Sequence, residues 1–270
     1  MSIFPRRTKR AEMAISEREL SQLTRDLDEL HESTFPQLRK TIDEMATNLG
    51  NVVRQPSTRR GFFLGAAGAV ALGAAAACSS GSSNSGAPAS TTPSLPAAPA
   101  ENYTGDLKVV ALATALENLA VAAYGGALKK AGAGELGTVP PAVSTFVQTA
   151  MKQHIDHAQA WNAVLSTAGK PAISNAPLSI TQDQLAMLTA ATSVPDVAKL
   201  VLNLENVAAQ TYTFATGNVS DAVGIMTAAT IQPVETMHAA ILNLILGQYP
   251  IPDSFIPVTN SLKLDTLTVK

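Results

Sequence analysis

The chain contains one short pattern twice, with a glutamate placed inside an apolar helical stretch each time. Leu116–Tyr124 reads LENLAVAAY and Leu204–Tyr212 reads LENVAAQTY, so both follow L-E-N-[L/V]-A-x-x-x-Y. Burying a carboxylate among apolar side chains is costly unless it is paired or binds a cation. A fold that buries the same glutamate twice therefore has to supply a partner for it twice.

Apolar periodicity after residue 104 predicts four long helices, which cover 106–131, 140–168, 195–216 and 220–246. The connection between the second and the third is long and contains a short helix over 181–191. Four helices with one long crossover predict an all-α four-helix bundle over residues 104–248. The Pro- and Ile-containing residues 249–270 predict an extended C-terminal tail.

Each half of this predicted bundle also carries a histidine after its glutamate. His157 and His238 are each followed by alanine and, five residues on, by asparagine. His154 and Glu235 lie three residues before them, and residues at i and i+3 share a helix face. We interpret the two halves as an internal duplication of a helical hairpin. After Cys78 the chain has three histidines, and all three belong to this set.

The arrangement resembles the ferritin-like di-iron carboxylate superfamily and, more narrowly, the exported ferritin-like domain proteins of bacteria. The family's bundle supplies a glutamate from each of two helices and Glu-x-x-His from the other two. The resemblance implies that the metal ligands are Glu117, His157, Glu205, Glu235 and His238. It departs from the family at His154, where the family has a glutamate, so His154 would be an unusual sixth ligand.

The departure at His154 changes the expected charge of the site. Four carboxylates neutralise two divalent cations, whereas three carboxylates with neutral imidazoles leave a charge of about +1. The expected occupants are a single metal, a divalent pair, or none, with Fe or Mn ahead of Zn. Tyr124 and Tyr212 lie seven residues after their glutamates; we expect core residues with satisfied hydroxyls, and the alternative is that they donate to the ligands.

The resemblance implies oxygen- or peroxide-linked redox chemistry or metal oxidation. The alternative is a metal-free ferritin-like scaffold or interaction protein of the cell envelope, whose buried glutamates are protonated or hydrogen-bonded. The residues alone do not decide whether the chain is an enzyme. The net charge of -2 gives no indication of nucleic-acid binding.

The first 58 residues have a different composition. Residues 1–60 hold 11 of the 19 Lys and Arg residues of the chain, and no arginine follows Arg60. Leucines at heptad-like spacing predict two amphipathic helices, separated at Ser33-Thr34 before Pro36. This cytoplasmic segment would associate with itself or with a partner through residues 15–53. The alternative is a misassigned start codon, with translation beginning at Met45.

An apolar run from Phe62 to Cys78 follows Arg59 and Arg60. Its 17 residues are few for a membrane span and suit a signal peptide. The segment 59–78 resembles a twin-arginine export signal that ends in a lipobox, with Ala75 where leucine is usual. Cys78 would then be lipidated; the alternative is an uncleaved anchor.

Residues 79–103 are rich in Ser, Ala and Pro and predict a flexible linker. We therefore expect export by the twin-arginine machinery and a lipid-anchored domain at the outer face of the cytoplasmic membrane.

Overall fold

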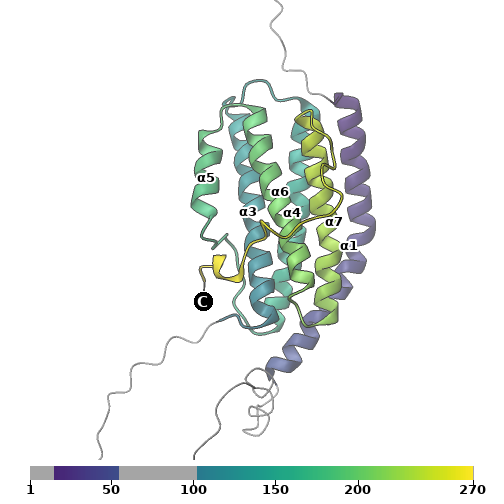
Figure 1. The fold of residues 1–270 in the computed structure, drawn as a ribbon, viewed down its shortest axis with the longest axis vertical. Coiled ribbons are helices and arrows are strands. Elements are labelled where there is room, and N and C mark those ends of the chain that lie inside the picture. Colours follow the sequence, from purple (N-terminus) through teal and green to yellow (C-terminus); the bar gives the residue numbers. More distant parts are fainter. Residues whose placement is uncertain (1–14, 55–101, 270) are drawn as a thin grey trace, which may run out of the picture.

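The computed structural model describes residues 15–54 and 102–269, which form six α-helices and no strand (Figure 1). The predicted signal, with Arg59, Arg60 and Cys78, lies outside the described residues, as does the linker up to residue 101. The helices are α1 (Glu17–Arg54), α3 (Asp106–Gly132), α4 (Pro141–Thr167), α5 (Thr181–Ala190), α6 (Val194–Thr216) and α7 (Ala222–Ile245), with a 3-10 helix η2 (Leu264–Thr266).

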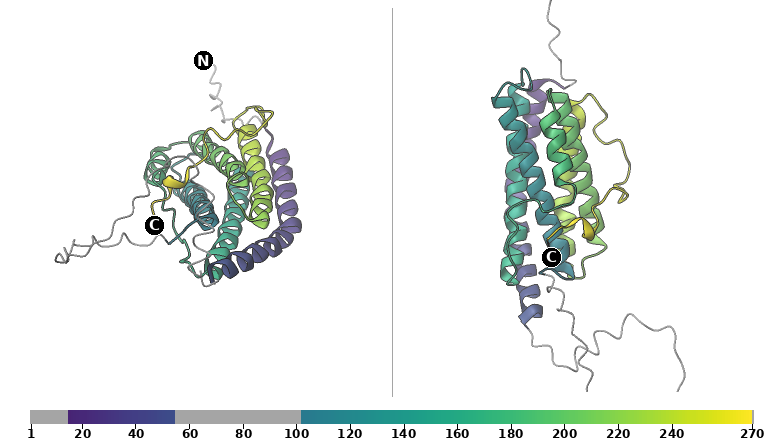
Figure 2. Two further views of the ribbon diagram at one scale, coloured as in Figure 1. Left: turned by 60° about the horizontal axis from the view of Figure 1, so that its bottom comes forward. Right: turned by 90° about the vertical axis from the view of Figure 1, so that its left-hand side faces the viewer.

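Helices α3, α4, α6 and α7 form a four-helix bundle, and α5 lies in the long crossover between α4 and α6 (Figures 1 and 2). The prediction of an all-α bundle is confirmed, and each predicted helix ends within two residues of the observed one. One side chain links the two halves of the bundle. The Asp106 carboxylate at the start of α3 accepts hydrogen bonds from the N–H groups of Ser220 and Asp221 at 3.0 and 2.9 Å, and Asp221 itself caps α7.

Asparagines at matching positions hold the chain segments that leave the bundle. Asn162 exchanges two hydrogen bonds of 2.8 Å with the backbone of Ile173 in the crossover. Its counterpart Asn243 donates to the carbonyl of Pro250 at 3.2 Å. The C-terminal tail in turn pairs with the crossover through an isolated bridge between Leu178 and Leu267. The repeated asparagines thus have structural roles and leave the core to the repeated glutamates and histidines.

Helix α3 is the one helix among the described residues that is long and apolar enough to cross a membrane. Its most apolar window has a mean hydropathy of 1.4, and 78% of that window is buried inside the protein. This burial is what a central helix of a bundle requires, and α3 indeed packs against α4 and α6.

The prediction of two N-terminal helices is wrong, because α1 continues for 38 residues through Pro36. A proline inside a helix removes one backbone hydrogen bond but does not always end the helix. The hydroxyls of Ser33 and Thr34 donate back to the carbonyl of Leu30 at 2.9 and 2.7 Å. They therefore follow the helical backbone instead of capping a new helix.

Helix α1 packs along the outside of the bundle, against α4 and α7 (Figure 2). The heptad-like pattern is buried only in part, because Leu23 and Leu30 are exposed. The large apolar residues of α1 that are buried are Leu20, Leu27, Phe35, Leu38, Ile42 and Met45. The approach to α7 is close at Gly224, where an added Cβ would lie 2.7 Å from Met45 Cε. The apolar face that suggested association with a partner is covered here by the bundle of the same chain.

Two identical substitutions on α1 test whether this helix is docked in solution. Leu27 is 4% exposed, whereas Leu30, one turn further along, is 48% exposed. We expect Leu27→Ala to lower the free energy of unfolding by about 2–5 kcal/mol and Leu30→Ala to change it by less than about 0.5 kcal/mol. Urea unfolding of the full chain measures both values. Equal effects would show that α1 is not packed on the bundle.

Candidate metal centre

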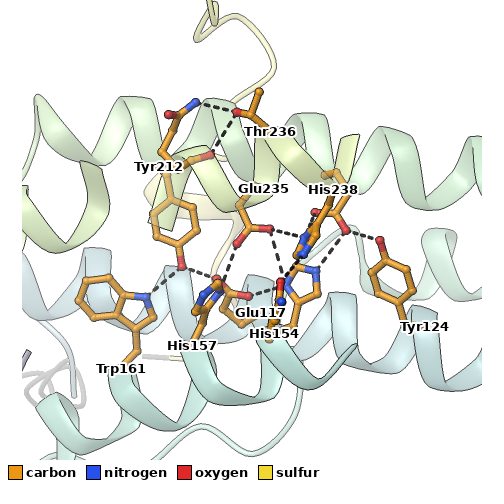
Figure 3. A network of polar contacts seen from close by, with 12 residues as sticks. Glu117, Tyr124, His154, His157, Trp161, Tyr212, Glu235, Thr236 and His238 are labelled. Carbon is orange, nitrogen blue, oxygen red and sulfur yellow. Dashed lines mark hydrogen bonds and ion pairs between the residues drawn. The ribbon is translucent and has the colours of Figure 1, made fainter. Parts of the chain in front are cut away.

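The structure brings all six predicted ligands together inside the bundle, and Figure 3 labels all of them except Glu205. Helices α3 and α6 contribute one glutamate each, and α4 and α7 contribute two residues each, one helical turn apart. Every one of these side chains is 2% exposed or less: Glu117, His154, His157, Glu205, Glu235 and His238. That they bind a metal stays a prediction, but their convergence in the core is a property of the fold.

The ligands form two overlapping groups of four, and in each group the ligand atoms lie within 4.8 Å of one another. The first group consists of Glu117, His154, His157 and Glu235, and the second of His154, Glu205, Glu235 and His238. Both groups share one imidazole and one carboxylate. The arrangement therefore offers two adjacent positions for a cation, with the shared side chains between them.

Glu235 is the shared carboxylate, and neither of its oxygens makes a hydrogen bond. Oε1 lies 3.2 Å from His157 Nδ1, and Oε2 lies 3.5 Å from His238 Nδ1. Ligand atoms about 2.1 Å from a metal, at tetrahedral or right angles, lie about 3.0–3.4 Å apart. The spacing around Glu235 is thus close to that of atoms that coordinate a common ion.

Several other buried atoms of the cluster also have no hydrogen-bond partner. These atoms are Glu205 Oε2, both ring nitrogens of His157, and His238 Nδ1. A buried polar atom without a partner costs roughly 1–3 kcal/mol, so native proteins seldom leave several together. A bound cation would satisfy the carboxylate oxygens and one nitrogen of each imidazole, and the residues present therefore fit a divalent metal.

His154 lies between the two repeated glutamates. Its Nδ1 is 2.7 Å from Glu117 Oε2, and its Nε2 is 3.1 Å from Glu205 Oε1. A protonated imidazole donates to both carboxylates at once, which links α3 to α6 through α4. To bind a metal, His154 has to give up at least one of these hydrogen bonds. The departure from the family pattern therefore places a proton-carrying cation where a fourth carboxylate would be.

Without metal, the repeated glutamates and the three histidines have shifted pKa values. Burial opposes the charged form of His157, but the nearby carboxylates of Glu117 and Glu235 outweigh it and raise the pKa of His157 to about 9. Burial likewise opposes ionisation of Glu117, but His157 and His154 lower the pKa of this carboxyl to about 2. The carboxylates also raise the pKa values of His154 and His238, so a metal has to compete with protons on the imidazoles.

The repeated tyrosines cross over between the halves. The Tyr124 hydroxyl donates to Glu205 Oε1, and the Tyr212 hydroxyl donates to Glu117 Oε1. Each tyrosine therefore serves the glutamate of the other repeat. The indole N–H of Trp161 donates to the Tyr212 hydroxyl at 2.9 Å and extends one of these chains (Figure 3). The hydroxyls are satisfied, as expected of core residues, and their acceptors are the predicted ligands.

Sequence reasoning gave no role at the site to three residues that contact its histidines. The Gln153 side-chain oxygen lies 2.9 Å from His238 Nε2, which leaves His238 Nδ1 directed toward the carboxylates. His31 and Phe35 of α1 place their ring centroids 5.4 and 6.0 Å from that of His157. The available signal was His31 itself, a histidine in the heptad-like apolar pattern of the N-terminal helix.

A family model described as Ferritin-like domain matches residues 105–248. This range contains the four bundle helices and all six predicted ligands, whereas α1 precedes it. The comparisons with curated proteins and with solved structures give no match.

The pKa shifts predict how pH affects the metal-free protein. His157, with its pKa raised to about 9, stabilises the fold fully below its ordinary pKa of 6.5 and loses this contribution as the pH rises through about 9. Glu117, with its pKa lowered to about 2, contributes above its ordinary pKa of 4.5 and loses this as the pH falls toward 2. We expect the free energy of unfolding, measured with urea and a chelator, to be highest between these ordinary values.

Two controls accompany this pH series. Glutamine donates a hydrogen bond without titrating, so His157→Gln is expected to reduce the loss of stability between pH 6.5 and 9. Saturation with metal is expected to reduce it as well, because the bound ion replaces the protons. A metal-free protein that becomes more stable from pH 6.5 to 9 would contradict the assigned protonation of the cluster.

Proposed function

Since the chain belongs to the ferritin-like family, we propose that its core centre binds divalent metal for redox chemistry with oxygen or peroxide, or for metal oxidation. The observation that carries this proposal is Glu235, whose two buried oxygens lack hydrogen bonds and face histidines of both helix pairs. Carboxylate and imidazole ligands suit Fe and Mn, and also Zn. When bound, Fe or Mn supplies the electron-transfer steps that the side chains cannot provide.

The surrounding residues hold the ligands for this role. Tyr124 donates to Glu205 Oε1 and leaves Glu205 Oε2 without a hydrogen bond and available to a metal. Tyr212 donates to Glu117 Oε1, and Glu117 Oε2 becomes available once His154 gives up its hydrogen bond to it. Gln153 fixes the ring of His238 in the same way. Hydrogen bonds of this kind orient ligands and fix their protonation. Because the six ligands are almost fully buried, the cluster also excludes bulk water.

The shared His154 favours divalent over more oxidised occupants. With two divalent ions, three carboxylates and neutral imidazoles, the whole site has a net charge of about +1. Each oxidation of a metal ion makes this net charge more positive. A single divalent ion in either group of four leaves His154 able to keep one hydrogen bond to a glutamate. We therefore propose one divalent ion or a divalent pair as the resting state of the centre.

A second candidate function, a metal-free scaffold of the cell envelope, is favoured by the charge balance of the cluster. Three carboxylates face three histidines, and the carboxylates raise the pKa of His154 well above its ordinary range although burial opposes this. Protonated imidazoles would then supply the positive charge that a metal ion would otherwise bring to the carboxylates. The two candidates differ in what removal of a carboxylate does, because only the metal-binding protein loses a bound ion.

Metal analysis of Glu235→Gln separates the two candidates. We expect the full-length chain, purified without chelator, to contain one or two Fe or Mn ions, and Glu235→Gln to lose most of this metal. Glu135→Gln is the matched control, because Glu135 lies on the surface after α3, where it pairs with Lys130. Its metal content should equal that of the unchanged protein.

The opposite outcome is equally clear. A protein that contains no metal, and whose melting temperature stays constant when Fe(II), Mn(II) or Zn(II) is added, would leave the scaffold as the function. Ligands that bind the folded state alone raise the melting temperature, so this second measurement does not depend on metal surviving purification.

We further propose that the domain is exported and tethered to the membrane, on the basis of Arg59, Arg60 and Cys78 in the sequence. The packing of α1 on the bundle adds a requirement. Cleavage before Cys78 would separate α1 from the bundle in the chain, and an uncleaved anchor would hold the two on opposite sides of the membrane. Export therefore requires that α1 leaves the bundle.

The first residue of the protein in the cell envelope tests this proposal. We expect mass spectrometry of the membrane fraction to find a lipidated chain that begins at Cys78, and Cys78→Ser to abolish that form. Replacement of Arg59 and Arg60 by lysine keeps the charge and is expected to retain the protein in the cytoplasm. A protein isolated with α1 still attached, and found in the soluble fraction, would contradict export.

A further inference from the structure

The contact between α1 and α4 buries a histidine without a hydrogen-bond partner. His31 is 4% exposed, and neither of its ring nitrogens makes a hydrogen bond. Its ring stacks on Phe35 at a centroid distance of 4.7 Å and lies 5.4 Å from the ring of His157. A buried imidazole can pack on an aromatic ring, but its unpaired nitrogens are costly. Their burial here calls for a partner that the protein itself does not supply.

Two carboxylates complete a set of donors around this histidine. The ligand atoms of His31, Glu32 and Asp156 lie within 4.8 Å of one another, on α1 and α4. We call these three residues the seam site. The Glu32 side chain is 59% exposed and that of Asp156 is 26% exposed, so the site runs from solvent to the buried imidazole.

The seam site already attracts a cation. The Lys152 ammonium group pairs with Glu32 and lies 3.4 Å from Asp156 Oδ2. The Lys152 side chain is 52% exposed and flexible, so it can move into solvent when another cation arrives. The buried nitrogens of His31, in contrast, receive nothing from Lys152. A metal ion that replaces the ammonium group would satisfy the carboxylates and the imidazole together.

We propose that His31, Glu32 and Asp156 bind a divalent metal ion, and that this ion passes from the seam site to the core centre. One imidazole and two carboxylates suit Fe(II), Mn(II) and Zn(II).

The donors form a path of increasing burial. Glu32 is exposed, Asp156 is intermediate, and His31 is buried beside His157, a predicted ligand of the core centre. Both nitrogens of His157 also lack a hydrogen-bond partner, so two unpaired imidazoles lie next to each other along this path. Binding at the seam site does not depend on the core centre. The loading role rests on the proposed function.

Titration of the metal-free full-length chain with Co(II), followed by visible absorption, tests the seam site. We perform it in the Glu235→Gln background, where the core centre is weakened. Glu32→Gln is expected to weaken the remaining Co(II) binding at least tenfold. Glu29→Gln, the same change on an exposed residue of α1, is expected to leave it unchanged. Lys152→Met removes the competing ammonium group and is expected to tighten binding. Equal affinities in Glu32→Gln and Glu29→Gln would overturn the proposal.

Metal uptake by the otherwise unchanged protein tests the loading role. We expect His31→Asn to slow the incorporation of Mn(II) into the core at least tenfold, while the final core occupancy and the circular dichroism spectrum stay the same. An unchanged rate would overturn loading through the seam site. If the unchanged protein binds Co(II) at the seam alone, the proposed core function fails and the seam site stands. If the unchanged protein binds Co(II) in the core alone, the seam site fails and the proposed core function stands.

Discussion

The fold depends on how three buried carboxylates obtain positive charge. Glu117, Glu205 and Glu235 lie in an apolar bundle that does not tolerate unpaired anions. Imidazolium groups or a metal ion are the two sources of charge within their reach. Either source joins α3, α4, α6 and α7 at the same point, so the cluster adds a specific constraint to the inward orientation that the apolar faces favour. The remaining core is largely Ala, Val and Leu, which pack well but specify the arrangement less strictly.

The sequence predicted the bundle helices and the ligands because both rest on local patterns. Apolar periodicity identified the four helices, and the matching order of Glu117 and His157 with Glu205 and His238 identified the duplication. The crossed hydrogen bonds of Tyr124 and Tyr212 were not predicted. A seven-residue spacing places a tyrosine on the face of its own glutamate, but the partner glutamate depends on how the two hairpins meet.

The N-terminal helix α1 shows that a local sequence pattern does not identify the surface on which a helix packs. The spacing of Leu20, Leu27 and Leu38 predicted an apolar face but could not say what covers it. Pro36 was taken as a helix stop, although the loss of one hydrogen bond is small beside the apolar contacts that α1 makes on both sides of it. The contact of Gln153 with His238 could not be predicted either, because it joins α4 to α7 and depends on how the two hairpins meet.

Helix α1 precedes the predicted signal in the chain but packs on the domain that follows it. If cleavage at Cys78 releases this helix, His157 loses the ring contacts of His31 and Phe35 that cover it in the present fold. Loading through the seam site needs His31 of α1, so the centre would then be filled before cleavage, while the precursor is still in the cytoplasm. Under that order of events, the metal in the mature protein reflects the supply inside the cell at the time of folding, and not the metals that the domain meets outside.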